Sequence, residues 1–126
     1  MYLFLSSQDL KTLDLCLLDQ SVIHIQAHLE TTPESFLFSL DEQLTQWGTN
    51  LSQMQGVVVV SGPGSFTSSR LSVTIANAIA FRYTLPILAI ANPERLPIET
   101  LVQTIDFSQL SHSFAQPVYD RPPFIT

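Results

Sequence analysis

Residues 57–72 read Val-Val-Val-Val-Ser-Gly-Pro-Gly-Ser-Phe-Thr-Ser-Ser-Arg-Leu-Ser, and this stretch decides how the chain folds. Four consecutive valines predict a strand that is buried on both faces, because a half-exposed strand would alternate apolar and polar residues. Gly62, Pro63 and Gly64 then break the chain. Ser65 is placed to cap a helix that is predicted to run to about Tyr83. The stretch therefore predicts a strand, a tight turn and a helix.

The chain before this stretch predicts three strands and a helix. Residues 1–6, 12–18 and 22–29 have strand patterns and are joined by short polar turns, which predicts an antiparallel meander. A helix is predicted from Pro33 to Gly48. Its apolar residues recur at helical spacing, at Phe36, Leu40, Leu44 and Trp47.

The chain after the stretch predicts a fifth strand over residues 86–91 and helix over residues 93–105, in two pieces because Pro97 interrupts it. This order of elements is that of a ribonuclease H-like half-domain, as in the actin, sugar-kinase and Hsp70 superfamily. The predicted fold class is therefore α/β, with a mixed five-stranded sheet. We expect residues 1–106 to form this domain and residues 107–126 to form an extended, proline-rich C-terminal segment.

Composition limits the class of protein. The 126 residues fit one domain, and 45% hydrophobic with 13% charged residues indicates a packed core. No apolar stretch approaches the roughly 20 residues of a membrane helix, and the first residues are interpreted as a strand, not a secretion signal. Cys16 is the single cysteine, which fits a reducing cytoplasm. The net charge is −6 and the five Lys and Arg residues are scattered, so we expect no direct nucleic-acid binding.

The turn after the valines resembles the signature of the TsaB (YeaZ) family. The matching residues are Gly62, Pro63, Gly64, Ser65, Phe66, Thr67 and Arg70. The chain departs from the family pattern in three places. Leu5-Ser6-Ser7 stands where Asp-Thr-Ser is usual, Ser68 and Ser72 replace two glycines, and only a short stretch stands where members usually carry a second half-domain.

The resemblance implies a non-catalytic subunit of the system that makes N6-threonylcarbamoyladenosine in tRNA. It implies a TsaD-like catalytic subunit as partner, bound through packed helices, with a TsaE-like ATPase possible in the same complex and a homodimer when the chain is alone. Two alternatives stay open. One is a small phosphotransferase or ATPase that uses the Gly62–Ser65 turn, and the other is a self-associating interaction module with a changed partner.

We assign no catalytic residue, no cofactor and no metal ligand. The turn lacks the lysine of a P-loop and the third glycine of a dinucleotide fingerprint, so we interpret it as a structural turn. His24 and His28 lie four residues apart on a strand, roughly 13 Å, too far to share one ion. The helix serines have no nearby His or Asp in the sequence, and Cys16 lies among leucines, which favours a buried thiol.

The second helix predicts a partner interface. Ser68, Leu71, Ile75, Ala78 and Arg82 form one stripe, which we expect to face the sheet. Phe66, Ser69, Val73, Ala76 and Ala80 form another, which we expect to face outward and to accept a helix. Phe38 points away from the apolar face of the first helix. The predicted interface is Phe38, Phe66, Ser69, Arg70, Val73, Ala76, Asn77 and Ala80; the alternative is that the C-terminal segment covers this surface.

Overall fold

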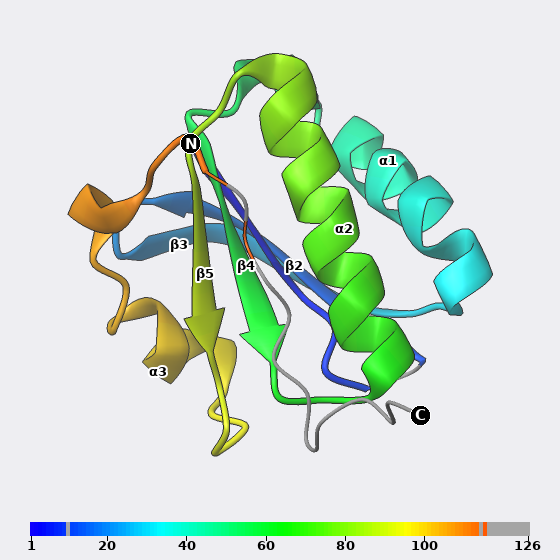
Figure 1. The fold of residues 1–126 in the computed structure, drawn as a ribbon. Coiled ribbons are helices and arrows are strands. Elements are labelled where there is room, and N and C mark those ends of the chain that lie inside the picture. The colour runs from blue at the N-terminus through cyan, green and yellow to red at the C-terminus, as the bar shows by residue number, and fades with distance from the viewer. Residues whose placement is uncertain (10, 114, 116–126) are drawn as a thin grey trace.

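A computed structural model of the chain describes residues 1–9, 11–113 and 115, except for the side chain of Phe66. It contains a five-stranded sheet with helices on both faces (Figure 1). The strands are β1 (Tyr2–Ser6), β2 (Thr12–Asp19), β3 (Val22–Glu30), β4 (Gly56–Gly62) and β5 (Ile87–Ala91). The helices are α1 (Phe36–Gln46), α2 (Phe66–Tyr83) and α3 (Ile98–Val102), with short 3-10 turns η1 (Pro33–Ser35), η2 (Leu51–Gln53) and η3 (Phe107–Gln109).

The strand order is β3-β2-β1-β4-β5. Strand β2 pairs antiparallel with both β1 and β3, whereas β4 pairs parallel with both β1 and β5. The predicted meander followed by parallel strands is therefore confirmed, as is the α/β class with a mixed five-stranded sheet. All seven residues of β4 are buried, which is what four consecutive valines predict for a strand covered on both faces.

The two faces of the sheet bury two separate hydrophobic clusters. Helices α1 and α2 lie side by side on one face, over Leu3 and Leu5 of β1 and over Leu13, Leu15 and Leu17 of β2. The short helix α3 and η3 cover the other face, over Phe4, Cys16 and Val58. None of the described helices is both long and apolar enough to cross a membrane.

Helix α2 has the predicted bounds but the opposite orientation. Ser69, Val73, Ala76 and Ala80 face the sheet, with exposures of 1%, 2%, 0% and 7%. The prediction that they form an outward stripe is wrong. Small residues on the inner side let the helix lie close to the sheet, whereas the bulkier Leu71 and Ile75 lie half-buried at its flank. Ala78 and Arg82, predicted to face the sheet, are exposed.

The region after β5 contains less helix than predicted. Of residues 93–105, only Ile98–Val102 are α-helical, because the side chain of Asn92 binds Leu96 and holds the intervening residues in a turn. The chain beyond residue 106 continues to pack on the sheet. The Phe107 and Tyr2 ring centroids are 4.8 Å apart, and Ser111 exchanges backbone hydrogen bonds with Ile87 at 2.8 and 3.1 Å. The predicted extended segment from residue 116 onward lies outside the described residues.

Ser69 offers a stability prediction. Among the described residues its buried hydroxyl has no hydrogen-bond partner, so Ser69→Ala is expected to raise the free energy of unfolding by about 1 kcal/mol. Ser72→Ala is the matched control, because Ser72 is equally buried but donates a hydrogen bond to the Ser69 carbonyl at 3.2 Å. We expect little change for the control. Urea denaturation of the three proteins measures both effects, and a destabilised Ser69→Ala would show that the hydroxyl is needed.

Candidate functional site

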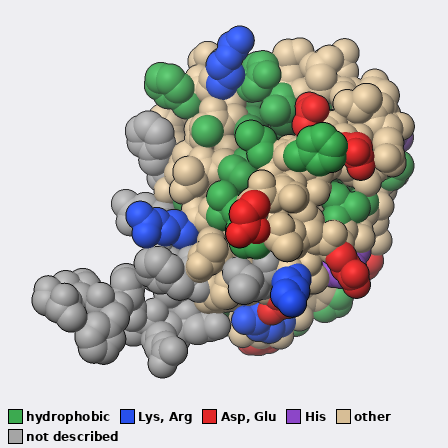
Figure 2. Space-filling model, turned by 90° about the vertical axis from the view of Figure 1, so that its right-hand side faces the viewer, with side chains coloured by type: hydrophobic (Ala, Val, Ile, Leu, Met, Phe, Trp, Pro, Cys, Tyr) green, Lys and Arg blue, Asp and Glu red, His purple; other side chains and the backbone are tan. Residues whose placement is uncertain are grey.

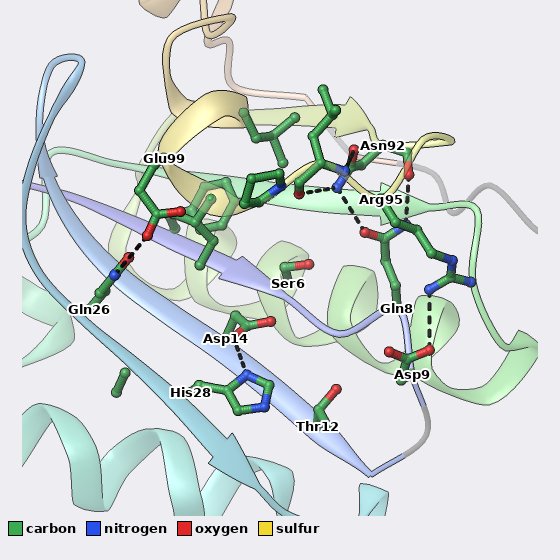
Figure 3. Close-up of a pocket in the computed structure, with 16 residues that line it drawn as sticks. Ser6, Gln8, Asp9, Thr12, Asp14, Gln26, His28, Asn92, Arg95 and Glu99 are labelled. Carbon is green, nitrogen blue, oxygen red and sulfur yellow. Dashed lines mark hydrogen bonds and ion pairs between the residues drawn. The ribbon is translucent and has the colours of Figure 1, made fainter.

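A cleft of about 500 Å³ opens on the α3 face of the sheet, where β1 and β5 end (Figure 3). One wall is formed by β2 and β3. The opposite wall is the segment from Asn92 through the first residues of α3. The cleft is of the size that small-molecule sites usually have, and polar residues line much of it.

Three polar residues cross the sheet in one row along the cleft. Ser6 on β1 lies opposite Asp14 on β2, and Asp14 lies opposite His28 on β3. We call Ser6, Asp14 and His28 the cleft row. Phe4 and Cys16, the pair two residues further into the sheet on the same face, are fully buried. The α3 face of the sheet therefore changes from apolar to polar at the cleft, in a row that three separate strands supply.

Asp14 and His28 form a close ion pair. The His28 Nδ1 atom lies 2.5 Å from Asp14 Oδ1, and the side chains are 62% and 29% exposed for His28 and Asp14. The hydrogen bond that the Asp14 carboxylate accepts, together with its negative charge, raises the pKa of His28 above its usual value. Among the described residues, the second oxygen of Asp14 has no hydrogen-bond partner.

Ser6 is more buried than the other two residues of the cleft row. The residue is 7% exposed, and its side chain lines the cleft and points into it (Figure 3). The part of the chain that the structure describes gives its hydroxyl no hydrogen-bond partner. Because this hydroxyl faces the cleft and makes no hydrogen bond within the described residues, it is available to a polar group of a ligand.

Two polar contacts close the ends of the cleft. At one end Arg95 Nη1 donates to Asp9 Oδ1 at 3.2 Å. At the other end Gln26 Nε2 donates to Glu99 Oε1 at 3.0 Å, which joins β3 to α3 and lowers the pKa of the Glu99 carboxyl. Both contacts join segments that are far apart in the sequence.

The signature turn lies directly beside the cleft and is bound into the protein. The side-chain amide of Gln8 donates to the carbonyl groups of Pro63 and Asn92, at 2.6 and 2.9 Å. The Asn92 backbone N–H donates to the Gly62 carbonyl at 2.8 Å. Asn92 is 4% exposed and its side chain also binds Gln8 and both backbone groups of Leu96. The turn is therefore tied to the ends of β1 and β5.

Gly64 and Ser65 complete the contacts of the turn. A Cβ atom on Gly64 would lie 2.5 Å from the Gln8 carbonyl oxygen, closer than real Cβ atoms come, so this position requires glycine. The Ser65 backbone N–H donates to the same carbonyl at 3.0 Å, and its side chain accepts from the Ser68 N–H as the predicted helix cap. These contacts give the residues of the signature a structural role. Thr67 lies in the first turn of α2 and is exposed.

The remaining site predictions concern metal ligands, Cys16 and the partner interface. Among the described residues no group of three or more His, Cys, Asp or Glu is placed to hold a metal ion. Cys16 is buried, as predicted, and its burial raises the pKa of the thiol to about 12, so it stays protonated at neutral pH. Of the predicted interface, Phe38 is 69% exposed and Arg70 is exposed, whereas the four small residues of α2 are in the core.

Asn77, also predicted for the interface, contacts the C-terminal part of the chain instead. Its side-chain amide donates to the Ala115 carbonyl at 3.0 Å and accepts from the Ala115 N–H at 2.8 Å. The alternative that the chain's own C-terminal segment covers part of α2 is thus correct at this position. The side chain of Phe66 lies outside the described residues.

The cleft row was not predicted, although the sequence carried a partial signal. Ser6 and Asp14 occupy strand positions whose neighbours two residues away are apolar or partly buried, whereas those of His28, Gln26 and Glu30, are polar and exposed. Only the register between the three strands brings them together. A shift in the β2–β3 register at Leu17 and Leu18 adds to this difficulty, because it breaks the simple alternation along β3.

Comparisons with known proteins agree with the signature. Residues 23–104, more than half of the chain, match the family model described as TsaD: tRNA N6-adenosine threonylcarbamoyltransferase. The tRNA threonylcarbamoyladenosine biosynthesis protein TsaB of Haemophilus influenzae is 37% identical over 62 residues, which are 49% of this chain and 26% of that protein.

Two solved structures share the fold. YeaZ from Pseudomonas aeruginosa, and a protein of the same organism described as uncharacterised with similarity to peptidase YeaZ, each superpose with a TM-score of 0.62 at 21% identity. Each match covers 72% of this chain and 43% of the other, so this chain spans less than half of the proteins it resembles. The chain belongs to the family described as TsaD, tRNA N6-adenosine threonylcarbamoyltransferase, and the predicted resemblance to its TsaB (YeaZ) relatives is confirmed.

Proposed function

We propose that this chain is a non-catalytic accessory subunit in the formation of N6-threonylcarbamoyladenosine in tRNA. The observation that carries the proposal is its membership of the transferase family over residues 23–104. In the same chain, the signature turn is occupied by contacts within the protein. A subunit of this kind supports a catalytic partner and does not carry the reaction itself.

The charge of the chain supports a role through a partner. A net charge of −6 with five Lys and Arg residues disfavours direct contact with the tRNA phosphates. In this proposal a TsaD-type subunit holds the catalytic centre and the tRNA in the cytoplasm, and a TsaE-type ATPase joins the complex. This chain positions and stabilises the TsaD-type subunit.

In this proposal the partner surface lies on the outer sides of α1 and α2. Leu37 and Phe38 near the start of α1 are 59% and 69% exposed, and Phe81 near the end of α2 is 79% exposed. We call these three residues the helical face. Figure 2 shows this side of the molecule, where hydrophobic side chains gather among acidic ones. Exposed aromatic residues of this kind are typical of protein–protein contacts, and the same face would join two copies of the chain when the partner is absent.

A substitution that introduces a charge on the helical face tests this proposal. Phe38→Glu is expected to weaken binding of a matched TsaD-type subunit by about tenfold or more, because a large apolar contact is replaced by a charge. Val22→Glu is the matched control, since Val22 is 66% exposed and lies at the start of β3, away from the helical face. Isothermal titration calorimetry measures the affinities, and thermal melting verifies that both variants fold.

Three outcomes of the titration are distinct. Loss of affinity in Phe38→Glu with unchanged affinity in Val22→Glu supports α1 as the contact. Equal affinity of all three proteins would rule out this part of the helical face. No detectable binding of the unaltered chain to a TsaD-type subunit would count against the accessory role itself.

A further inference from the structure

The cleft row holds two polar atoms that the described residues leave without a partner. The Ser6 residue is 7% exposed and its hydroxyl points into the cleft, and the second carboxylate oxygen of Asp14 has no hydrogen-bond partner among the described residues on the same side of the sheet (Figure 3). The two residues lie directly opposite each other on β1 and β2. Their side chains therefore project side by side from the same face of the sheet into the cleft.

The spacing of Ser6 and Asp14 fits one nitrogen atom that carries several N–H donors. Opposite residues of antiparallel strands have Cα atoms about 4.5–5.5 Å apart. No hydrogen bond joins the Ser6 hydroxyl to the Asp14 carboxylate directly. A nitrogen lying about 2.8–3.0 Å from each oxygen could bridge them. An ammonium group has three N–H donors and no acceptor, so it satisfies two acceptor oxygens with one atom.

The charges around the cleft favour a cation. Asp9, Asp14 and Glu99 contribute three carboxylates, while Arg95 already donates to Asp9 and His28 already binds Asp14. An anion such as a nucleotide phosphate would meet net repulsion here. A bare divalent ion is also disfavoured, because the described residues contain no group of three ligands placed to hold one.

The wall opposite the cleft row carries apolar side chains between its polar ones. Leu96 and Ile98 on either side of Pro97, together with Leu101 of α3, line this side of the cleft. Leu101 is 4% exposed and belongs to the hydrophobic cluster under α3. A ligand that fills the cleft therefore needs an apolar part that packs on this wall as well as a cationic end.

We propose that the cleft binds a small-molecule primary amine with a short apolar stem. Its ammonium group lies between the Asp14 carboxylate and the Ser6 hydroxyl, and its stem packs against Leu96, Ile98 and Leu101. This site goes beyond the proposed accessory function and does not depend on it, because no residue of the cleft row belongs to the helical face.

Three probes with the same stem test the chemistry of the site. Hexylamine, hexanol and hexanoate present a cation, a neutral hydroxyl and an anion, and amide chemical shifts of the full chain are followed by NMR near neutral pH. We expect hexylamine to shift the amides of Ser6, Asp14 and His28 with saturation. Hexanol is expected to bind about tenfold more weakly, and hexanoate not to saturate, because the ammonium makes charge-assisted hydrogen bonds.

Variants locate the binding group. Asp14→Asn is expected to weaken hexylamine binding about tenfold or more, and Ser6→Ala about threefold, since a hydrogen bond to a charged acceptor is the stronger. Asp41→Asn, on the exposed side of α1, removes the same charge outside the cleft and is expected to leave the affinity unchanged. The NMR spectra show directly whether each variant is folded.

Two results would overturn the proposal. One is an equal response to hexylamine and hexanoate, which would mean that the stem alone decides binding. The other is an unchanged affinity in both folded Asp14→Asn and folded Ser6→Ala. Because the measurement uses the isolated chain, its failure would leave the accessory function untouched, and failure of partner binding would leave this site untouched.

Discussion

Ala76→Arg is expected to abolish stable folding of the chain. Ala76 is 0% exposed and lies in the hydrophobic cluster between α2 and the sheet. An arginine there overfills the packed layer and buries a charge without a partner. The combined cost is expected to exceed about 4 kcal/mol, a large fraction of the stability of a small domain. Circular dichroism and thermal melting of the purified protein measure the loss.

Ala78→Arg is the control that makes this result specific. It lies two residues further along the same helix, but its side chain is exposed. The same substitution is expected to change stability by no more than about 0.5 kcal/mol at this surface position. If Ala76→Arg folded as stably as Ala78→Arg, the orientation of α2 described above would be wrong.

Gly64→Ala is expected to have the second large effect. The added Cβ would lie 2.5 Å from the Gln8 carbonyl oxygen and 2.8 Å from the Gln8 Cα, and both are backbone atoms that no side-chain rotation can move. The end of β1 would have to shift away from the signature turn, and the hydrogen bonds of Gln8 to Pro63 and Asn92 would be strained. We expect a loss of about 3 kcal/mol, measured by urea denaturation.

Gly48→Ala separates this steric clash from the conformational cost of replacing a glycine that has a positive φ. Gly48 has a φ of +72° and nothing within 4 Å of a built Cβ, so alanine there meets conformational strain without a clash. The expected cost is about 1 kcal/mol. A Gly64→Ala variant that is no less stable than Gly48→Ala would show that the close approach of Gln8 is not a constraint.

Local signals in the sequence predicted the elements well. The predicted helix cap at Ser65 and the predicted end near Tyr83 match the bounds of α2 in the structure. The four valines predicted β4, because a short apolar run that ends at a glycine turn is typical of a buried strand. These features depend on neighbours in the chain and need no tertiary contact.

The orientation of α2 could not be predicted in the same way. Both stripes of the helix carry apolar residues, and the larger side chains of Leu71 and Ile75 favoured the wrong one for the core. The distance between α2 and the sheet decides which side of the helix faces inward. Small side chains such as those of Ala76 and Ala80 fit at that distance. A pattern of hydrophobic residues does not contain this distance.

The cleft row depended on three-dimensional register in a similar way. Asp14 and His28 are fourteen residues apart in sequence, and Ser6 is eight residues before Asp14, yet they form one line across three strands. The pairing follows from the length of each turn and from the irregularity near Leu18. A polar residue on a strand is usually solvent-exposed, so none of the three was distinctive alone.

Mass spectrometry of tRNA digested after an in vitro reaction tests the central proposal most directly. The reaction contains a matched TsaD-type subunit, a TsaE-type ATPase, substrates and unmodified tRNA, with or without this chain. The accessory role predicts that N6-threonylcarbamoyladenosine forms when the chain is present and falls at least tenfold when the chain is omitted or replaced by Phe38→Glu. Full modification in the complete absence of the chain would contradict the proposed function.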